Sequence, residues 1–129
     1  MVDERAVGIG VIGIEHLHVF ELVDGLLGAG AVAVAHSDGD DSFGALYADW
    51  QPTSQLRSVE QVLHDDRIDL VVVCGVPAER AAVTCAALHA GKDVLSAKPG
   101  VTTAAQLDAV RSAATASGRR WRCRDCRPR

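Results

Sequence analysis

Two short segments constrain the fold most, because neither alternates apolar with polar side chains. Residues 6–12 form the continuous apolar run Ala-Val-Gly-Ile-Gly-Val-Ile, and residues 69–75 read Asp-Leu-Val-Val-Val-Cys-Gly. A strand without polar alternation must be covered on both faces, which is typical of parallel sheets flanked by helices. The sequence therefore predicts an α/β fold with buried strands.

Segments with apolar residues at helical spacing alternate with these strands. Ser58 with Gln61, and Thr103 with Gln106, form capping boxes that predict two helix starts, and Gly118 follows the last helix. The alternation predicts a doubly wound, mostly parallel sheet in a three-layer α/β/α arrangement. The predicted strands are residues 6–12, 31–35, 55–57, 69–75 and 93–96, and the predicted helices are residues 16–27, 43–50, 58–64, 78–90 and 103–117.

Length and composition agree with a single globular domain. A chain of 129 residues is near the commonest domain size, and 48% hydrophobic with 23% charged residues excludes a disordered chain. Its apolar runs are shorter than the roughly 20 residues that a membrane helix needs. The acidic start, residues 1–5, does not resemble a secretory signal. We therefore expect a cytoplasmic protein without membrane contact.

Charge is unevenly distributed along the chain. Residues 1–118 carry 7 lysine and arginine residues against 16 acidic ones, whereas residues 119–129 carry 6 arginines and 1 aspartate. The basic segment is either an arm that binds nucleic acid or a tail outside the fold. Nucleic acid is the less favoured partner, because the acidic body repels phosphate. The predicted organisation is one domain over residues 1–118 followed by a basic tail over residues 119–129.

A ligand site is expected where the parallel strands end. In doubly wound sheets, ligands bind beyond the carboxyl ends of the strands, at the point where the strand order reverses. The segment from Gly8 to Gly13 satisfies the pattern G-x-G-x-x-G, but Gly8 and Gly10 lie inside the predicted strand. A phosphate-binding loop must follow the strand, so we assign these two glycines to close backbone packing.

The loop after the first strand is the candidate cofactor loop. It reads Gly13-Ile14-Glu15-His16-Leu17-His18, and Gly13 suits the tight turn. Glu15 stands where a second glycine usually lets the backbone approach a pyrophosphate, and its charge opposes an anionic ligand. Glu15 is either a ligand-facing residue or a partner of the helix dipole. His16 and His18 point to different faces, so no shared metal is expected.

Asp38 is the candidate that selects between the two nicotinamide dinucleotides. It follows the second strand, 25 positions after Gly13, about where a carboxylate would bond the ribose 2′-hydroxyl and repel a 2′-phosphate. This position favours NAD over NADP. The alternative is that Asp38, Asp40 and Asp41 form a solvated acidic loop.

The four cysteines do not indicate a metal or redox site. Cys74 and Cys85 fall in a strand and a helix, where a free cysteine behaves as a small apolar residue. Cys123 and Cys126 form a C-x-x-C pair, but no second ligand pair accompanies it.

Three segments carry a resemblance to a known family. Residues 90–95 read Ala-Gly-Lys-Asp-Val-Leu and precede Lys98-Pro99, residues 73–77 read Val-Cys-Gly-Val-Pro, and the cofactor loop has the order Gly-Ile-Glu-His-Leu-His. From about residue 6 to residue 121 the chain resembles the Gfo/Idh/MocA family. Its members are NAD(P)-dependent oxidoreductases that act mainly on sugars, polyols and related compounds. The resemblance implies a Rossmann-like domain that binds a nicotinamide dinucleotide.

The resemblance also implies roles for individual residues. In the family, the lysine at the position of Lys98 lies near the nicotinamide and the substrate hydroxyl. An ammonium group there polarises the reacting oxygen and assists proton transfer, which makes Lys98 the candidate catalytic residue. Gly75, Val76, Pro77, Lys98 and Pro99 are the candidate cofactor-binding residues in this part of the chain. The alternative is that Lys98 is a surface lysine in a turn.

The chain departs from the family pattern at several positions. Ala97 replaces the acidic residue usual before the lysine, and Ala78 and Arg80 stand where asparagine or histidine is usual. Family members also continue through a sixth strand into a second domain with substrate contacts, a catalytic Asp/His pair and the dimer surface. Residues 119–129 show no strand pattern, so we expect the sixth strand to be absent. We interpret this tail as non-homologous sequence, as from a frameshift or a premature stop.

These observations support two functions of different classes. The first is the NAD-binding domain of an oxidoreductase that transfers hydride between a nicotinamide and a sugar, polyol or related hydroxy compound. It is expected to be inactive alone and to meet a small-molecule substrate only with a second domain. The alternative is a non-catalytic Rossmann-like binding or interaction module. An absent sixth strand would leave an exposed sheet edge, which favours a homo-oligomer.

Overall fold

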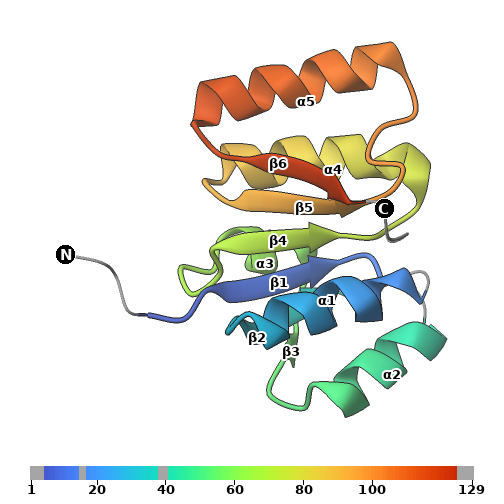
Figure 1. Cartoon of the computed structure of the whole chain (residues 1–129), viewed down its shortest axis with the longest axis vertical. Helices are drawn as coiled ribbons and strands as arrows, with labels where there is room; N and C mark the ends of the chain where they lie inside the picture. The colour runs from blue at the N-terminus through green and yellow to red at the C-terminus, as the bar shows by residue number, and fades with distance from the viewer. Residues whose placement is uncertain (1–4, 15–16, 38–40, 125–129) are drawn as a thin grey trace.

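A six-stranded, all-parallel sheet forms the centre of the molecule (Figure 1). The computed structural model describes residues 5–14, 17–37 and 41–124. The strand order is β3-β2-β1-β4-β5-β6, and it reverses between β1 and β4. The strands are β1 (Gly8–Ile12), β2 (Val32–Ser37), β3 (Gln55–Leu56), β4 (Leu70–Val73), β5 (Asp93–Ala97) and β6 (Trp121–Arg124). The helices are α1 (His18–Gly28), α2 (Asp41–Trp50), α3 (Val59–Leu63), α4 (Pro77–His89) and α5 (Ala104–Ser117).

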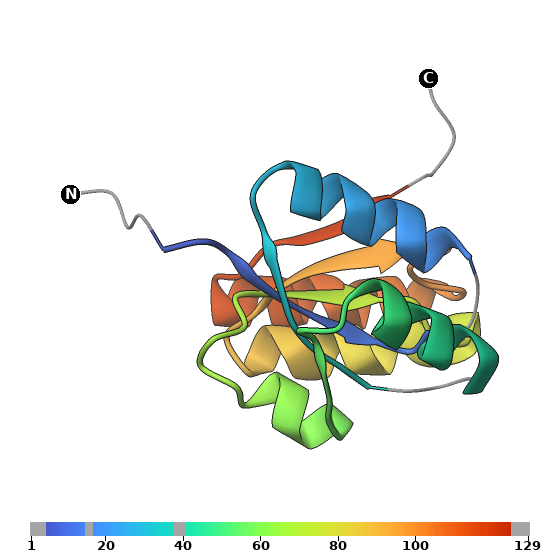
Figure 2. The ribbon, with the colours of Figure 1, turned by 90° about the horizontal axis from the view of Figure 1, so that it is seen from below.

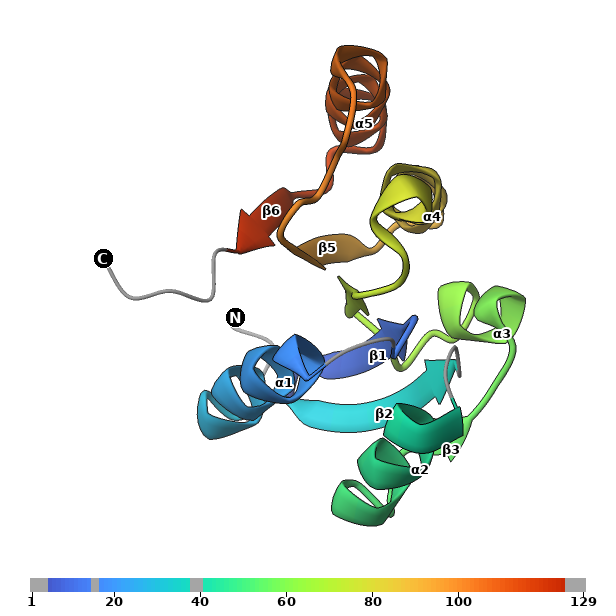
Figure 3. The ribbon, with the colours of Figure 1, turned by 90° about the vertical axis from the view of Figure 1, so that its right-hand side faces the viewer.

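Side chains of the central strands alternate between two hydrophobic cores. Val71 and Val73 pack with residues of α3, α4 and α5, while Val72 packs with residues of α1 and with Tyr47 of α2. Figures 2 and 3 show α1 on one side of the sheet and α3 and α4 on the other. Both faces are therefore covered, as the apolar runs predict, and the doubly wound three-layer α/β/α fold is confirmed.

The helix boundaries follow local signals closely, with one difference. Ser58 forms the predicted capping box with Gln61, and Gly118 ends α5 in a left-handed conformation with φ of 69°. Thr103 accepts a hydrogen bond from the Gln106 N–H, as expected. The Gln106 side chain, however, accepts from the N–H of Thr102 instead of closing the box on Thr103.

A sixth strand follows α5, so the prediction that it is absent is wrong. Residues 121–124 pair with β5 in parallel, and the Trp121 indole Nε1–H donates to Ser96 Oγ over 2.9 Å. Trp121 and Cys123 both lie against Gly100; Trp121 is partly buried, and Arg122 and Cys123 are exposed. Because arginine takes alternate positions in residues 121–124, the segment has no apolar run, and hydrophobic periodicity does not predict it as a strand. The expected homo-oligomer depends on an exposed edge of β5. In the structure, β6 covers that edge.

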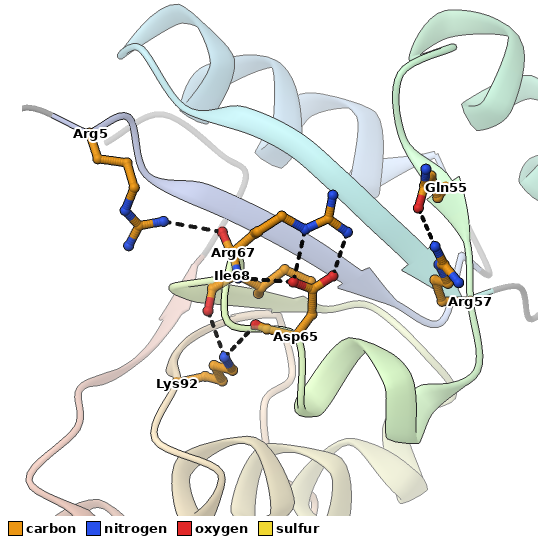
Figure 4. A network of polar contacts seen from close by, with 7 residues as sticks. All are labelled: Arg5, Gln55, Arg57, Asp65, Arg67, Ile68 and Lys92. Carbon is orange, nitrogen blue, oxygen red and sulfur yellow. Dashed lines mark hydrogen bonds and ion pairs between the residues drawn. The ribbon is translucent and has the colours of Figure 1, made fainter.

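Polar contacts hold the amino ends of the strands, at the edge opposite the expected ligand site (Figure 4). Lys92 Nζ donates to the carbonyl oxygens of Asp65 (2.8 Å) and Ile68 (2.7 Å), and Arg67 forms an ion pair with the Asp65 carboxylate at 2.7 Å. These contacts fix the turn before β4 against the start of β5. Within the described segments, no helix combines the length and apolar character required to cross a membrane.

Candidate functional site

The reversal of strand order creates a crevice between the segments that follow β1 and β4. Parallel strands end at the same edge, where α1 and α4 begin (Figure 1). A cavity of about 220 Å³ lies at this edge. It combines apolar side chains with a few polar groups, which is typical of ligand pockets. Its lining residues are Ile12, Gly13, Ser37, Val59, Val73, Gly75, Val76, Glu79, Arg80 and Val83.

Gly13 allows the segments after β1 and β4 to pass each other backbone to backbone. Its φ is +81°, which a side chain disfavours, and a Cβ placed there would lie 2.5 Å from Gly75 N. The Cys74 N–H also donates to the Ile12 carbonyl oxygen over 3.0 Å. Glycine at position 13 is therefore required by the crossing itself.

Gly8 and Gly10 serve packing inside β1, as the sequence predicts. A Cβ at Gly8 would overlap the carbonyl oxygen of Arg67, and one at Gly10 would lie 2.7 Å from Val62 Cγ1. Both glycines belong to the strand and precede the cofactor loop. The match of residues 8–13 to a glycine-rich motif thus arises from sheet packing.

The predicted cofactor-binding residues occupy different environments. Gly75 and Val76 line the cavity with Gly13, whereas Ile14 is fully buried in the core beneath α1. His18 is exposed at the start of α1, with its Nδ1 3.7 Å from the Glu21 carboxylate. The structure therefore brings Gly13, Gly75 and Val76 together and leaves Ile14 and His18 away from the cavity lining.

Three predicted residues, Glu15, His16 and Asp38, lie outside the described residues. Ser37, the last residue of β2, lines the cavity directly before Asp38 in the sequence. Pro77 occupies the first turn of α4, as its sequence position predicts, and it is exposed.

Lys98 follows β5 in an exposed segment beside the crevice. It precedes Pro99, and the peptide bond between the two is cis. Lys98 is absent from the lining of the cavity, which opens between the ends of β1 and β4. The candidate catalytic lysine and the cavity thus lie at the ends of neighbouring strands.

Arg80 is a site residue that sequence reasoning treated only as a departure from a pattern. It lies in the first turns of α4, lines the cavity and is only 2% exposed. Its guanidinium donates to three backbone carbonyl oxygens: Nε to Gly75 (2.7 Å), and Nη1 to Ala97 (3.1 Å) and Pro99 (3.0 Å). Burial lowers the pKa of Arg80 below the usual arginine value. The sequence carries no signal for this arrangement, because helical arginines are mostly exposed.

Comparison with known proteins places this architecture in a family. Residues 6–123 match the family model GFO_IDH_MocA, described as an oxidoreductase family with an NAD-binding Rossmann fold. The chain belongs to the Gfo/Idh/MocA family. The family match and the sheet both extend beyond residue 118, to residue 123 and Arg124 respectively.

Individual relatives agree with the Gfo/Idh/MocA assignment. Inositol 2-dehydrogenase 1 of Saccharopolyspora erythraea is 35% identical over 122 residues, which cover 88% of this chain and 33% of that protein. A crystal structure of a protein from Erwinia carotovora atroseptica, assigned as an oxidoreductase, shares 32% identity with a TM-score of 0.85, over 91% of this chain and 35% of the other. Biliverdin reductase from Synechocystis sp. PCC 6803, crystallised with biliverdin and NADP⁺, shares the fold at 23% identity and a TM-score of 0.81, covering 91% of this chain and 37% of its own. The chain therefore spans about a third of the length of these relatives.

The helix starts at the crevice suit an anionic cofactor such as a nicotinamide dinucleotide. The N-cap residues are Leu17 in α1 and Val76 in α4, and neither side chain caps the first backbone N–H groups. In contrast, Ser58 and Thr103 cap α3 and α5 with hydrogen bonds. A helix start without a side-chain cap offers its N–H groups and positive dipole end to phosphate. The residues present at this Gfo/Idh/MocA site therefore fit the family's cofactor.

Proposed function

We propose that this chain binds NAD across the carboxyl ends of β1, β2, β4 and β5. In this proposal it forms the cofactor-binding part of an oxidoreductase acting on a sugar, polyol or related hydroxy compound. The crossing of Gly13 and Gly75 beside two helix starts without side-chain caps is the observation that carries it. The substrate class is supported by the similarity to inositol 2-dehydrogenase 1.

The cofactor loop would hold the diphosphate of NAD. The first N–H groups of α1 attract phosphate, and Gly13 keeps the backbone free of a side chain at the turn. Glu15 lies in the same loop in sequence, and its negative charge weakens this attraction. His16 neighbours it and is part of the proposed loop site.

Asp38 would determine the choice of NAD over NADP. It directly follows Ser37, the last residue of β2, which lines the cavity. A carboxylate there accepts a hydrogen bond from the ribose 2′-hydroxyl and repels a 2′-phosphate.

Lys98 would act at the other end of the cofactor. When bound, the nicotinamide ring accepts or donates the hydride. The Lys98 ammonium, beyond the end of β5, would polarise the reacting oxygen of the substrate and assist its proton transfer. Because the chain spans about a third of its relatives, we expect turnover only where a second domain supplies the substrate contacts.

Calorimetric titration with NADH and NADPH tests this proposal. We expect NADH to bind at least about tenfold more tightly than NADPH, because Asp38 repels the additional phosphate. Asp38→Ala should reduce that difference, while Asp41→Ala, at the first residue of α2, should leave it unchanged. Absence of heat with millimolar NADH, on protein shown to be folded, would refute the proposal.

A non-catalytic binding module is the second candidate, and Glu15 is the observation that favours it. If Glu15 reflects lost cofactor affinity, Glu15→Gln should convert a protein that does not bind NADH into one that does. Glu21→Gln is the matched control, because Glu21 is exposed in the first turn of α1. Tight binding of NADH by the unmodified chain would exclude this candidate.

A further inference from the structure

Arg80 joins two segments that are separated by about twenty residues in the sequence. Its Nε–H donates to the carbonyl oxygen of Gly75, in the turn between β4 and α4. Its Nη1 donates to the carbonyl oxygens of Ala97 and Pro99, which flank Lys98. One side chain therefore connects the wall of the cofactor crevice with the backbone on both sides of the candidate catalytic lysine.

The chemistry of the guanidinium suits this bridging role. Its donors have a fixed planar arrangement. Contacts to Gly75 and to residues 97–100, here called the Lys98 segment, therefore set the direction of both backbones together. Hydrogen bonds from a charged group are stronger than those between neutral groups, and Arg80 is buried. A lysine carries the same charge but cannot reproduce this fork.

The Lys98 segment is also in contact with β6. A Cβ at Gly100 would lie 2.9 Å from the Trp121 ring and 3.1 Å from Cys123 Sγ, so β6 lies directly against Gly100. Arg80 reaches the same segment from α4. Both β6 and Arg80 therefore contact the backbone next to Lys98.

We infer that Arg80 is a positioning residue, which holds the Lys98 segment at a set distance from the turn after β4. This role deepens the proposed function and rests on it, because Lys98 acts there at the nicotinamide end of NAD. Arg80 itself need not touch cofactor or substrate. Its loss would affect binding of the nicotinamide half more than binding of the adenosine half.

Comparing two ligands on the full chain separates positioning from general stability. ADP contains the adenosine and diphosphate of NADH and lacks its nicotinamide half. Loss of hydrogen bonds from a buried charged group should make Arg80→Met bind NADH about tenfold more weakly. Its affinity for ADP should change by less than about twofold. Arg80→Lys should resemble Arg80→Met, since the bridge and not the charge is required.

A readout without ligand tests the same inference. In Arg80→Met and Arg80→Lys, we expect faster deuterium uptake in a peptide covering residues 93–103, with uptake in β1 unchanged. The matched control is Arg111→Met, which removes an exposed arginine from α5. It should alter neither uptake nor affinity.

The possible outcomes separate the two proposals. An equal loss of NADH and ADP affinity, or faster uptake throughout the chain, would mean that Arg80 only stabilises the fold and would overturn the inference. Unchanged uptake over residues 93–103 would also overturn it. If the unmodified chain binds neither ligand, the proposed function fails, and the uptake comparison alone decides the role of Arg80. Should Arg80→Met not fold, Arg80→Lys carries the same comparison.

Discussion

Gly13 is the residue on which the geometry of the crevice depends most. Gly13→Ala adds both a strained φ and a collision with the backbone of Gly75. We expect it to lower the free energy of unfolding by about 2 to 4 kcal/mol and to weaken NADH binding. Urea denaturation and calorimetry measure the two effects.

Gly91→Ala is the control for this substitution. Gly91 also has positive φ (+86°), but open space surrounds the position of its Cβ. It should therefore cost only about 1 kcal/mol of strain and leave NADH affinity unchanged. Equal effects of the two substitutions would contradict the tight crossing of the segments after β1 and β4.

Asp65 makes the free energy of unfolding depend on pH in acidic solution. A hydrogen bond from the Arg67 side chain lowers the pKa of Asp65 to about 2, below the value of about 3.9 for an unfolded chain. A lowered folded pKa stabilises the protein above pH 4, and this contribution is lost as pH falls from 4 to 2. Because the pair is partly solvated, we expect Asp65→Asn to cost under about 1 kcal/mol at pH 7 and much less at pH 2.

Denaturant unfolding at several pH values measures this difference between the two proteins. Asp66→Asn, at the exposed neighbouring position, serves as the control. If the free energies of unfolding of Asp65→Asn and the unmodified chain differ by the same amount from pH 7 to pH 2, the role of the Asp65–Arg67 pair is contradicted.

Residue-level prediction from sequence succeeds where a backbone requirement selects the residue type. Gly13 was predicted because glycine suits the tight turn after a strand, and Gly8 and Gly10 because they fall inside a buried run. Arg80 could not be predicted in the same way. Its partners are backbone carbonyl oxygens of two distant segments, and no side-chain pattern marks them.

At the scale of elements, β6 shows the limit of hydrophobic periodicity. The four strands β1, β2, β4 and β5 were predicted from apolar runs. In β6, Trp121 and Cys123 lie against Gly100, and arginine takes the alternate positions in the sequence. Edge strands commonly carry charged side chains, which oppose pairing with a further chain. The basic composition after residue 118 thus led to the prediction of a tail where the structure has a strand.

Truncation tests the contribution of β6. A chain ending at Gly118 should lose at least about 3 kcal/mol of stability, because the contacts of the partly buried Trp121 disappear and the edge of β5 is exposed. A chain ending at Arg124 keeps β6 and should unfold at the same urea concentration as the full chain. If both truncated chains are equally stable, β6 adds nothing to the fold, and a domain over residues 1–118 would be the better description.

At the scale of the whole molecule, the amino ends and the carboxyl ends of the parallel strands differ in structure. At the amino edge, Lys92 Nζ donates hydrogen bonds to the carbonyl oxygens of Asp65 and Ile68, and these bonds hold the turn before β4 against the start of β5 (Figure 4). At the carboxyl edge, Gly13 and Gly75 cross beside helix starts that no N-cap side chain closes. The parallel arrangement predicted from sequence puts the candidate site at the carboxyl edge, because all carboxyl ends of a parallel sheet meet there.

Mapping NADH binding by ¹⁵N–¹H NMR tests the central claim most directly. We predict that the largest shift changes cluster at the carboxyl edge, at Gly13, Ser37, Gly75, Val76 and Lys98. The amides of Lys92, Asp65 and Ile68 at the opposite edge should remain unchanged. Changes centred on the amino edge, or no change at millimolar NADH in a well-dispersed spectrum, would contradict a cofactor site at the crevice between β1 and β4.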